Sequence, residues 1–262
     1  MFRRFRIAIL LYILILVGGG AWLTSRDSTD WEEPLWVLVY PINADHSKAS
    51  DSYIRALEPD SFTAIERFFS QQGRVYDLEL EQPVTIRLAT PLSVLPPSPP
   101  PGGNTLSVMW WSLKLRYWVW KVERQQSEPQ ADIKVFVLYH DPKLVSSLPH
   151  SLGLQKGLIG VVHAFSSAHM SQSNYVIITH EIMHTVGASD KYDPNSGHPI
   201  YPDGYAEPKL KPRYPQSKAE IMGGRIPLSQ KDAQISRSLK QVLVGQQTAI
   251  EIGWLTDLSQ LS

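Results

Sequence analysis

The residues best suited to chemistry in this chain are His180, Glu181 and His184, which form the pattern H-E-x-x-H. On a helix, residues four positions apart lie on one face about one turn apart, so both imidazoles can reach a single ion. Glu181 projects from the adjoining position and can contact a metal-bound water without itself being a ligand. The pattern therefore predicts a catalytic zinc site in which Glu181 is the general base.

The neighbouring residues favour a buried helix with a sharp end. Ser173 is a good N-cap residue, and Gly187 suits the position just after a helix, where a left-handed conformation is common. Apolar surface that would bury this helix comes from Tyr175, Val176, Ile178, Ile182 and Met183. We therefore expect both histidines on a helix packed into the domain.

Residues 180–190 fit H-E-x-x-H-x-x-G-x-x-D, which resembles the metzincin zinc-peptidase consensus with Asp in place of the usual third His. Snapalysin-like bacterial peptidases show this Asp variant. The resemblance implies that Gly187 turns the chain so that Asp190 returns to the metal as the third ligand. It also implies a methionine turn beneath the site, for which residues 221–224 are suitably placed, with Met222 as an apolar floor and not a ligand.

The third ligand has rivals elsewhere in the chain. Other zinc peptidases use a Glu further downstream, and Glu207 and Glu220 are available, although the offset and the preceding glycine favour Asp190. His163 and His169 can also approach a metal. A lone His on a strand, however, is more often a hydrogen-bonded core residue.

The loop after the motif carries oxygen ligands and phenols. A second ion, Ca²⁺, is possible there, because carboxylates and an amide cluster at Asp190, Asp193, Asn195 and Asp203. Many metzincins place a Tyr two residues after the Met, whereas this chain has Gly224. A phenol assisting the oxyanion would then come from Tyr192, Tyr201, Tyr205 or Tyr214, of which Tyr192 is nearest the ligands in sequence.

Composition excludes several other chemistries. The chain has 262 residues and no cysteine, which rules out disulfides, thiolate metal sites and cysteine nucleophiles, so a metal must bind His, Asp or Glu. Lys+Arg and Asp+Glu are equal at 25 each, and the one dense basic run outside the N-terminus, residues 209–213, is interrupted by proline. We therefore expect no nucleic-acid partner.

The order of elements indicates an α/β fold. Val-, Leu- and aromatic-rich stretches predict strands at residues 35–42, 84–89, 133–139 and 157–165. Helices are expected at residues 61–72, with Gly73 as C-cap, and after the Met-turn, where Ser229 and Asp232 form a capping-box pattern. Residues 91–103 are too rich in proline for helix or central sheet. The resemblance implies a metzincin-like mixed sheet with an active-site helix and a C-terminal helical subdomain.

Residues 105–122 carry four tryptophans among leucines, interrupted by Lys114, Arg116 and Lys121. These charges argue against a membrane span. The simpler interpretation is a helix packed into the domain. The alternative is an interfacial helix with its tryptophans at the depth of lipid headgroups.

The N-terminus carries a membrane signal. Arg3, Arg4 and Arg6 precede an uncharged stretch at residues 7–25 that is strongly apolar through Val17. We expect residues 1–25 to be a signal anchor with a transmembrane helix, residues 26–34 a linker, and residues 35–262 the zinc peptidase domain. The positive-inside tendency places the N-terminus in the cytoplasm and the domain outside, in the periplasm if the source is Gram-negative. Cleavage after Ala21 is an alternative.

Together these features predict a membrane-anchored zinc metalloendopeptidase, a hydrolase that acts on polypeptides. The resemblance implies that the strand near residues 157–164 is the edge strand that aligns an extended substrate by β-augmentation. Two alternatives are a zinc hydrolase of a non-peptide amide, such as a cell-wall crosslink, and a non-catalytic membrane-anchored scaffold on the same fold. Retention of Glu181 speaks against the scaffold.

Overall fold

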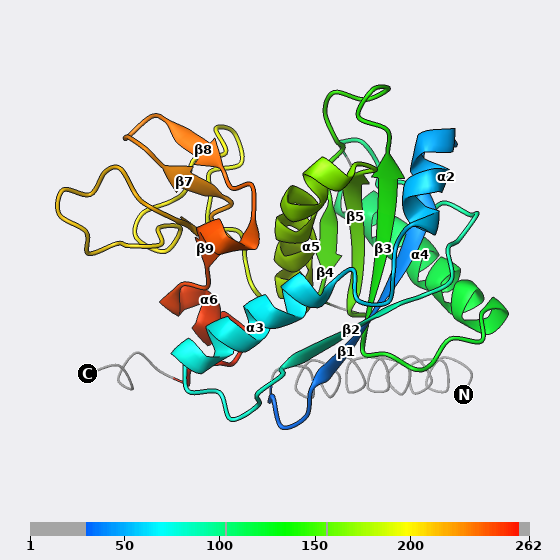
Figure 1. Ribbon diagram of the computed structural model, residues 1–262, viewed down its shortest axis with the longest axis horizontal. Coiled ribbons are helices and arrows are strands. Elements are labelled where there is room, and N and C mark those ends of the chain that lie inside the picture. Colours follow the sequence, from blue (N-terminus) through cyan, green and yellow to red (C-terminus); the bar gives the residue numbers. More distant parts are fainter. Residues whose placement is uncertain (1–29, 103, 156, 257–262) are drawn as a thin grey trace, which may run out of the picture.

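A five-stranded mixed sheet forms the centre of the computed structural model, which describes residues 30–102, 104–155 and 157–256 (Figure 1). The spatial order is β2-β1-β3-β5-β4, in which the first four strands are parallel and β4 is antiparallel to β5. Their bounds are β1 Leu35–Asn43, β2 Val84–Leu88, β3 Ile133–His140, β4 Leu152–Leu154 and β5 Ile159–Phe165. The strands predicted from the sequence are confirmed, and β4 is an additional one.

The central strands are apolar on both faces, as expected for a parallel sheet covered by helices on both sides. In β3, alternate residues such as Val135 and Val137 face one core cluster, while Phe136 faces the other. The register places Val39 opposite Val135 and Val137 opposite Val162. This pairing of buried β-branched residues fixes the position of β5, and the segment that follows β5 leads into the candidate metal site.

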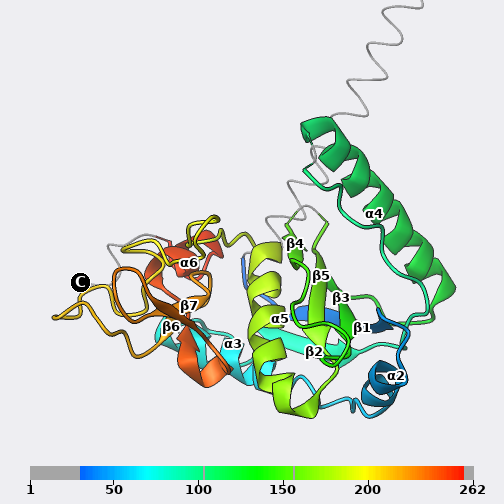
Figure 2. The same cartoon turned by 90° about the horizontal axis from the view of Figure 1, so that it is seen from above.

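Helices cover the two faces unequally (Figure 2). One face is covered by α2 (Lys48–Arg55), α3 (Thr63–Val75) and α5 (Ser171–Thr185), with the 3-10 helix η1 (Ala168–Met170) directly before α5. The other face is covered by the long helix α4 (Thr105–Gln125). The predicted helix at residues 105–122 is thus confirmed as α4. Gly73 does not end α3, because the helix continues through it to Val75 and Tyr76 is the C-cap residue.

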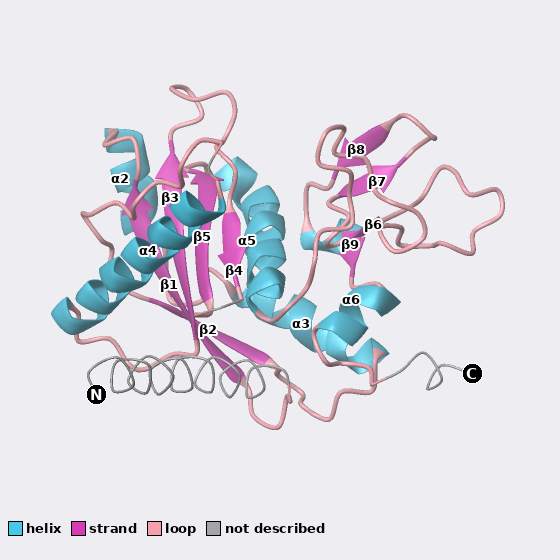
Figure 3. Ribbon diagram, turned by 180° about the vertical axis from the view of Figure 1, so that it is seen from behind, coloured by secondary structure: helices cyan, strands magenta, loops and turns pink. Residues whose placement is uncertain are grey.

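The C-terminal part lies on the side of α5 away from the sheet (Figure 3). It consists mainly of loops and short elements, namely β6 (Ala219–Glu220), β7 (Arg225–Pro227), β8 (Ala233–Ile235), η2 (Leu239–Gln241), β9 (Val242–Leu243) and α6 (Gln246–Glu251). The expected helical subdomain is therefore wrong for this part of the described chain. The polar pair Ser229 and Asp232 closes the turn between β7 and β8, where the Ser229 hydroxyl accepts hydrogen bonds from the backbone N–H groups of Lys231 and Asp232.

The packed region begins within the stretch expected to be a linker. Trp31 is buried, its indole N–H donates to the Ile252 carbonyl at 2.6 Å, and its ring meets Trp254 edge-on. Both ends of the described chain are therefore joined beside α6. Between residues 30 and 256, apart from the two omitted positions, no helix combines the length and the apolarity that crossing a bilayer requires. The anchor predicted at residues 7–25 lies outside the described residues.

Candidate metal centre

Helix α5 carries both histidines and ends in a Schellman motif. The N–H of Gly187 donates to the His184 carbonyl, and the N–H of Ala188 donates to the Met183 carbonyl, while Gly187 has a φ of 108°. Glycine is favoured there because a Cβ is strained at positive φ. The predicted helix end is confirmed. The predicted start is wrong, since α5 begins at Ser171, two residues before Ser173.

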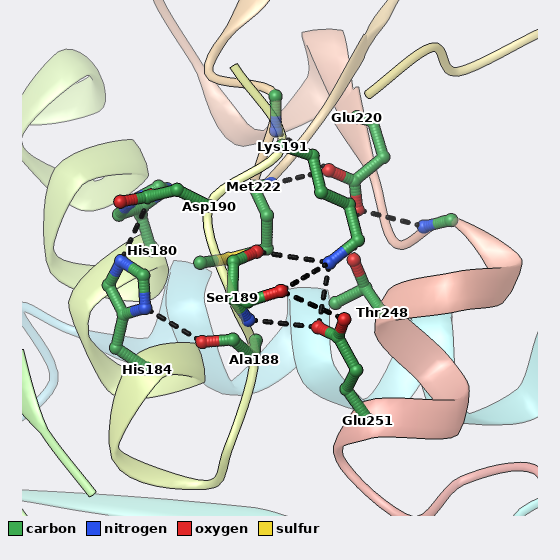
Figure 4. Close-up of polar contacts among 12 residues, drawn as sticks. His180, His184, Ala188, Ser189, Asp190, Lys191, Glu220, Met222, Thr248 and Glu251 are labelled. Carbon is green, nitrogen blue, oxygen red and sulfur yellow. Dashed lines mark hydrogen bonds and ion pairs between the residues drawn. The ribbon is translucent and has the colours of Figure 1, made fainter. Parts of the chain in front are cut away.

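The turn at Gly187 brings Asp190 back to the two imidazoles. Oδ1 of Asp190 lies 3.2 Å from His180 Nε2 and 3.1 Å from His184 Nε2 (Figure 4). One ligand atom from each of the three residues lies within 4.8 Å of the others. Three residues chosen from the sequence thus converge on one point, and the group has the donor types and spacing that can hold a metal ion.

Backbone carbonyls orient the two imidazoles. His180 Nδ1 lies 2.9 Å from the Ile221 carbonyl, and His184 Nδ1 lies 2.8 Å from the Ala188 carbonyl. A carbonyl oxygen can only accept, so each ring carries a proton on Nδ1. Nε2 is then the atom that would bind a metal, which would displace the proton that Nε2 shares with Asp190. This outer-shell arrangement is typical of metal-binding histidines. The donor set therefore fits zinc.

The charges in the site reinforce one another. Partial burial would raise the pKa of Asp190, but hydrogen bonds from His180 and His184 outweigh it and hold that pKa far below its ordinary value. Burial would lower the pKa of His180, but the hydrogen bond to Asp190 and the charge of Glu181 raise it overall. Asp190 is thus an anion at neutral pH, as a carboxylate ligand must be.

Glu181 lies buried beside the three candidate ligands. Burial raises its pKa, although the positive charges of His180 and His184 act to lower it. Its Oε2 is buried and has no hydrogen-bond partner among the described residues. A buried polar oxygen without a partner is costly, so this atom is suited to contact a water or a substrate group at the site.

The turn at Met222 lies where the resemblance implied. Met222 is fully buried, its carbonyl accepts from the Lys191 N–H at 2.9 Å, and the preceding Ile221 carbonyl contacts His180. The Glu220 carboxylate holds this turn by accepting from the N–H groups of Met222 and Gly223 at 2.6 and 2.7 Å. Met222 therefore packs in the core next to the site as an apolar residue.

The two rival glutamates are engaged elsewhere. The other oxygen of Glu220 accepts from the Thr248 hydroxyl at 2.7 Å and from the Gly245 N–H, and Glu220 is completely buried. Glu207 accepts hydrogen bonds from the backbone and side chain of Ser217. Neither belongs to the group that His180, His184 and Asp190 form.

Of the four tyrosines considered, Tyr192 lies at the site. Its ring centroid is 6.4 Å from that of His180, and burial, the charge of Asp190 and a hydrogen bond to Asp190 raise its pKa to about 12. Its phenol is therefore protonated at neutral pH. The other three form a separate cluster, in which Tyr205 and Tyr214 share a hydrogen bond of 2.8 Å and the Tyr201 ring meets that of Tyr205.

The other candidate ligands do not join the site. His163 lies on the face of β5 away from α5 and pairs with His140 at 2.9 Å, and His169 is exposed in η1. In the loop considered above as a possible Ca²⁺ site, Asp193 Oδ1 accepts from the N–H groups of Asn195 and Ser196. Within the described ranges, His180, His184 and Asp190 are the only group of three or more His, Cys, Asp or Glu residues placed to hold a metal ion.

The edge strand beside the site is β4, whereas the sequence led us to expect β5. β5 lies between β3 and β4, and β4 is the outermost strand on this side of the described sheet. A Cβ on Gly153 of β4 would lie 2.5 Å from both the Glu181 carbonyl oxygen and the His184 Cβ. The absence of a side chain therefore lets β4 pack directly against the metal-site turn of α5.

Sequence reasoning missed the residues that hold the ligand loop from the C-terminal end of the chain. Glu251, in α6, accepts hydrogen bonds from the N–H and hydroxyl of Ser189 and from Lys191 Nζ, so it holds the residues on both sides of Asp190. The one sequence feature that pointed to such a contact was the lysine directly after the expected ligand Asp190. Nothing in the sequence indicated which distant carboxylate would pair with it.

No protein-family model and no curated protein matches this chain. The functional assignment therefore depends on the geometry of the site.

Proposed function

We propose that this protein is a zinc-dependent metallopeptidase of the metzincin type with Asp as third ligand. The observation that carries the proposal is the convergence of His180, His184 and Asp190 on one point with the buried carboxyl of Glu181 beside them. Three protein ligands leave an open fourth position, which is typical of catalytic zinc sites.

A bound zinc ion would supply Lewis acidity toward the scissile carbonyl and toward the attacking water. Glu181 takes a proton from that water and delivers it to the leaving amine, a role that suits a carboxyl whose pKa burial has raised. Tyr192 keeps its phenolic proton at neutral pH and can donate it in a hydrogen bond to the developing oxyanion. Asp190 and the two histidines remain fixed by the backbone carbonyls and by Glu251.

An extended polypeptide is the substrate that the site favours. β4 pairs with β5 along one edge, and its other edge is not paired within the described sheet. Because this strand lies directly against α5, a peptide that added to its free edge would pass beside His184 and Glu181. This arrangement favours peptide bonds in extended chains over other amides.

The test uses the full chain purified in mild detergent. We expect about one zinc per chain and cleavage of a denatured protein, with no release of fragments from peptidoglycan. Glu181→Gln should keep the zinc and lose activity, whereas His184→Ala should lose both. Equal loss of zinc from the two variants would make Glu181 a ligand and contradict the mechanism, and cleavage of peptidoglycan alone would contradict the substrate.

We propose further that the chain is anchored in a membrane by residues 7–25, with the catalytic domain outside the cytoplasm. The support is the run of Arg3, Arg4 and Arg6 before the apolar segment. The protein should stay in the membrane fraction after carbonate washing, and protease added to intact spheroplasts should digest the domain. Protection that ends only on lysis would reverse the orientation, and release of a trimmed soluble form would show cleavage near Ala21.

A further inference from the structure

Helix α4 has a second apolar face that nothing in the described fold covers. Its inner face buries Trp111, Leu115, Val119 and Val122 against the sheet. Its outer face exposes six large apolar side chains with exposed fractions from 46% to 70%, namely Leu106, Met109, Trp110, Leu113, Tyr117 and Trp120. Exposed apolar surface on this scale marks an interaction site.

The six residues form one continuous stripe. They follow one another at intervals of one, three or four positions, which keeps them on one side of a helix. A helix of 21 residues is about 31 Å long at 1.5 Å per residue, so the stripe extends over most of that length. Figure 2 shows α4 as the outermost layer on its side of the sheet. The stripe therefore has the shape to lie flat on an extended surface.

Basic side chains border the stripe. Lys114 Nζ lies over the Trp110 ring at 5.8 Å from its centroid, and Arg124 lies over the Trp120 ring at 4.4 Å. Lys121 is exposed on the same border as Lys114, and Glu123 is already paired with Lys134 at 3.0 Å. Tryptophan and tyrosine beside lysine and arginine are the residues that favour the headgroup region of a bilayer.

Charge also favours a membrane over a second copy of this chain as the partner of the stripe. Helix α4 contains four basic residues and one acidic residue, so two copies joined through the stripe would bring like charges together. Anionic lipid headgroups would instead complement the border of the stripe. The proposed anchor ends at residue 25, and the described chain begins five residues later, at Asp30. An anchored domain would thus be kept close to the bilayer surface, which raises the effective concentration of the stripe there.

We propose that the outer face of α4 lies in the headgroup region of an anionic bilayer and orients the domain on it. This inference builds on the membrane anchoring proposed above, which would bring the domain to the bilayer surface. Because α4 and α5 cover opposite faces of the sheet, the arrangement directs the metal site away from the lipid. The substrates would then be polypeptides that approach from the aqueous side.

The test exploits the lack of cysteine, since a single introduced cysteine takes the only spin label. The full chain with Leu113→Cys is labelled and reconstituted into vesicles of phosphatidylcholine with phosphatidylglycerol. The matched control is Ile235→Cys, which is similarly exposed on β8 in the C-terminal part. At position 113, collisions with an aqueous nickel chelate should fall several-fold and collisions with oxygen should rise, relative to position 235.

The contribution of the lysine charges is tested with the same spin label at position 113. Adding Lys114→Gln and Lys121→Gln, or using phosphatidylcholine alone, should return the position 113 label toward aqueous values. Aqueous accessibility equal to that at position 235 in anionic vesicles would overturn the proposal. So would dipolar broadening at position 113 that disappears on dilution with unlabelled chain, because that result identifies a second copy as the partner.

Carbonate washing of the same vesicles distinguishes the two membrane proposals. A retained chain with a water-exposed label at position 113 would keep the anchor and reject the role of α4. A chain that the wash removes, but whose label was shielded before the wash, would keep the role of α4 and reject the anchor. Failure of both readouts would reject both.

Discussion

Lys191 Nζ lies 2.7 Å from Glu251 Oε2, so the residue that follows the candidate third ligand is paired with the last residue of α6. The Lys191 side chain is 5% exposed and that of Glu251 is 21% exposed. Glu251 also binds Ser189, on the other side of Asp190, through two hydrogen bonds of 2.8 Å (Figure 4). One carboxylate, 60 positions from the lysine, thus holds the ligand loop in place.

Replacing Glu251 by Gln should loosen the metal site and weaken the fold together. Zinc affinity should fall by about tenfold or more, as happens when outer-shell partners of metal ligands are removed. The free energy of unfolding should fall by about 2 kcal/mol, less than for a fully buried pair because Glu251 is partly exposed. Competition with a chromogenic chelator and urea unfolding measure the two effects.

The double variant Lys191→Met/Glu251→Gln is the control. It removes the uncompensated buried charge, so it should be more stable than Glu251→Gln alone. With Lys191→Met as the second single variant, the cycle gives the coupling energy of the pair. A coupling energy near zero would show that the ion pair does not stabilise the loop.

The same pair predicts a pH dependence. Partial burial would raise the pKa of Glu251, but hydrogen bonds from Lys191 and Ser189 outweigh it and keep the pKa below its ordinary value of 4.5. A carboxyl with a depressed folded pKa contributes stability above its unfolded pKa and loses it as the pH falls through the folded pKa. The difference in Tm between wild type and Glu251→Gln, both treated with EDTA, should therefore be constant from pH 6 to 7 and shrink below about pH 4.5. A difference that grows on acidification would contradict the assignment.

Local sequence signals predicted the elements whose causes are local. Alternation and β-branching indicated β1, β2, β3 and β5, and the glycine at 187 indicated the end of α5, because one short segment determines each feature. The Ser229 and Asp232 pattern failed because the same hydroxyl-to-N–H bonds that cap a helix can close a hairpin turn. The pairing of β8 with β7 selects the hairpin turn, and this pairing involves residues outside the Ser229 and Asp232 pattern.

Features that depend on distant residues were not predictable in the same way. The sequence supplied His180, His184 and Asp190, but the carbonyl of Ile221 and the carboxylate of Glu251 reach the site only through tertiary folding. β4 was missed because three residues are too few to show alternation. Its position at the sheet edge follows from antiparallel pairing with β5.

Replacing Asp190 by Ala should weaken zinc binding by orders of magnitude, because the carboxylate is the one anionic member of the proposed ligand set. Asp190→His should still bind zinc, since His is the commoner third ligand in the consensus that the motif resembles. The control is Glu207→Ala, which removes the rival glutamate bound to Ser217 and should leave zinc content unchanged. Glu220 is not a fair control, because its buried carboxylate holds the turn at Met222. Metal loss from Glu207→Ala but not from Asp190→Ala, measured after dialysis, would overturn the ligand assignment.

The last prediction concerns Gly153, where β4 meets α5. In Gly153→Ala the new Cβ would lie 2.5 Å from the Glu181 carbonyl oxygen and from the His184 Cβ, so strand and helix must separate. The free edge of β4 then moves relative to Glu181, and a displacement on the order of 1 Å can reduce catalysis by about a hundredfold. We expect kcat/KM on an extended peptide to fall by at least about tenfold while zinc content is retained. The matched control is Gly160→Ala on β5, the residue directly opposite Gly153, whose added Cβ would make ordinary contacts of 3.5 Å with Val135. Equal losses in the two variants would show a general effect on the sheet, and unchanged activity in Gly153→Ala would show that β4 does not align the substrate.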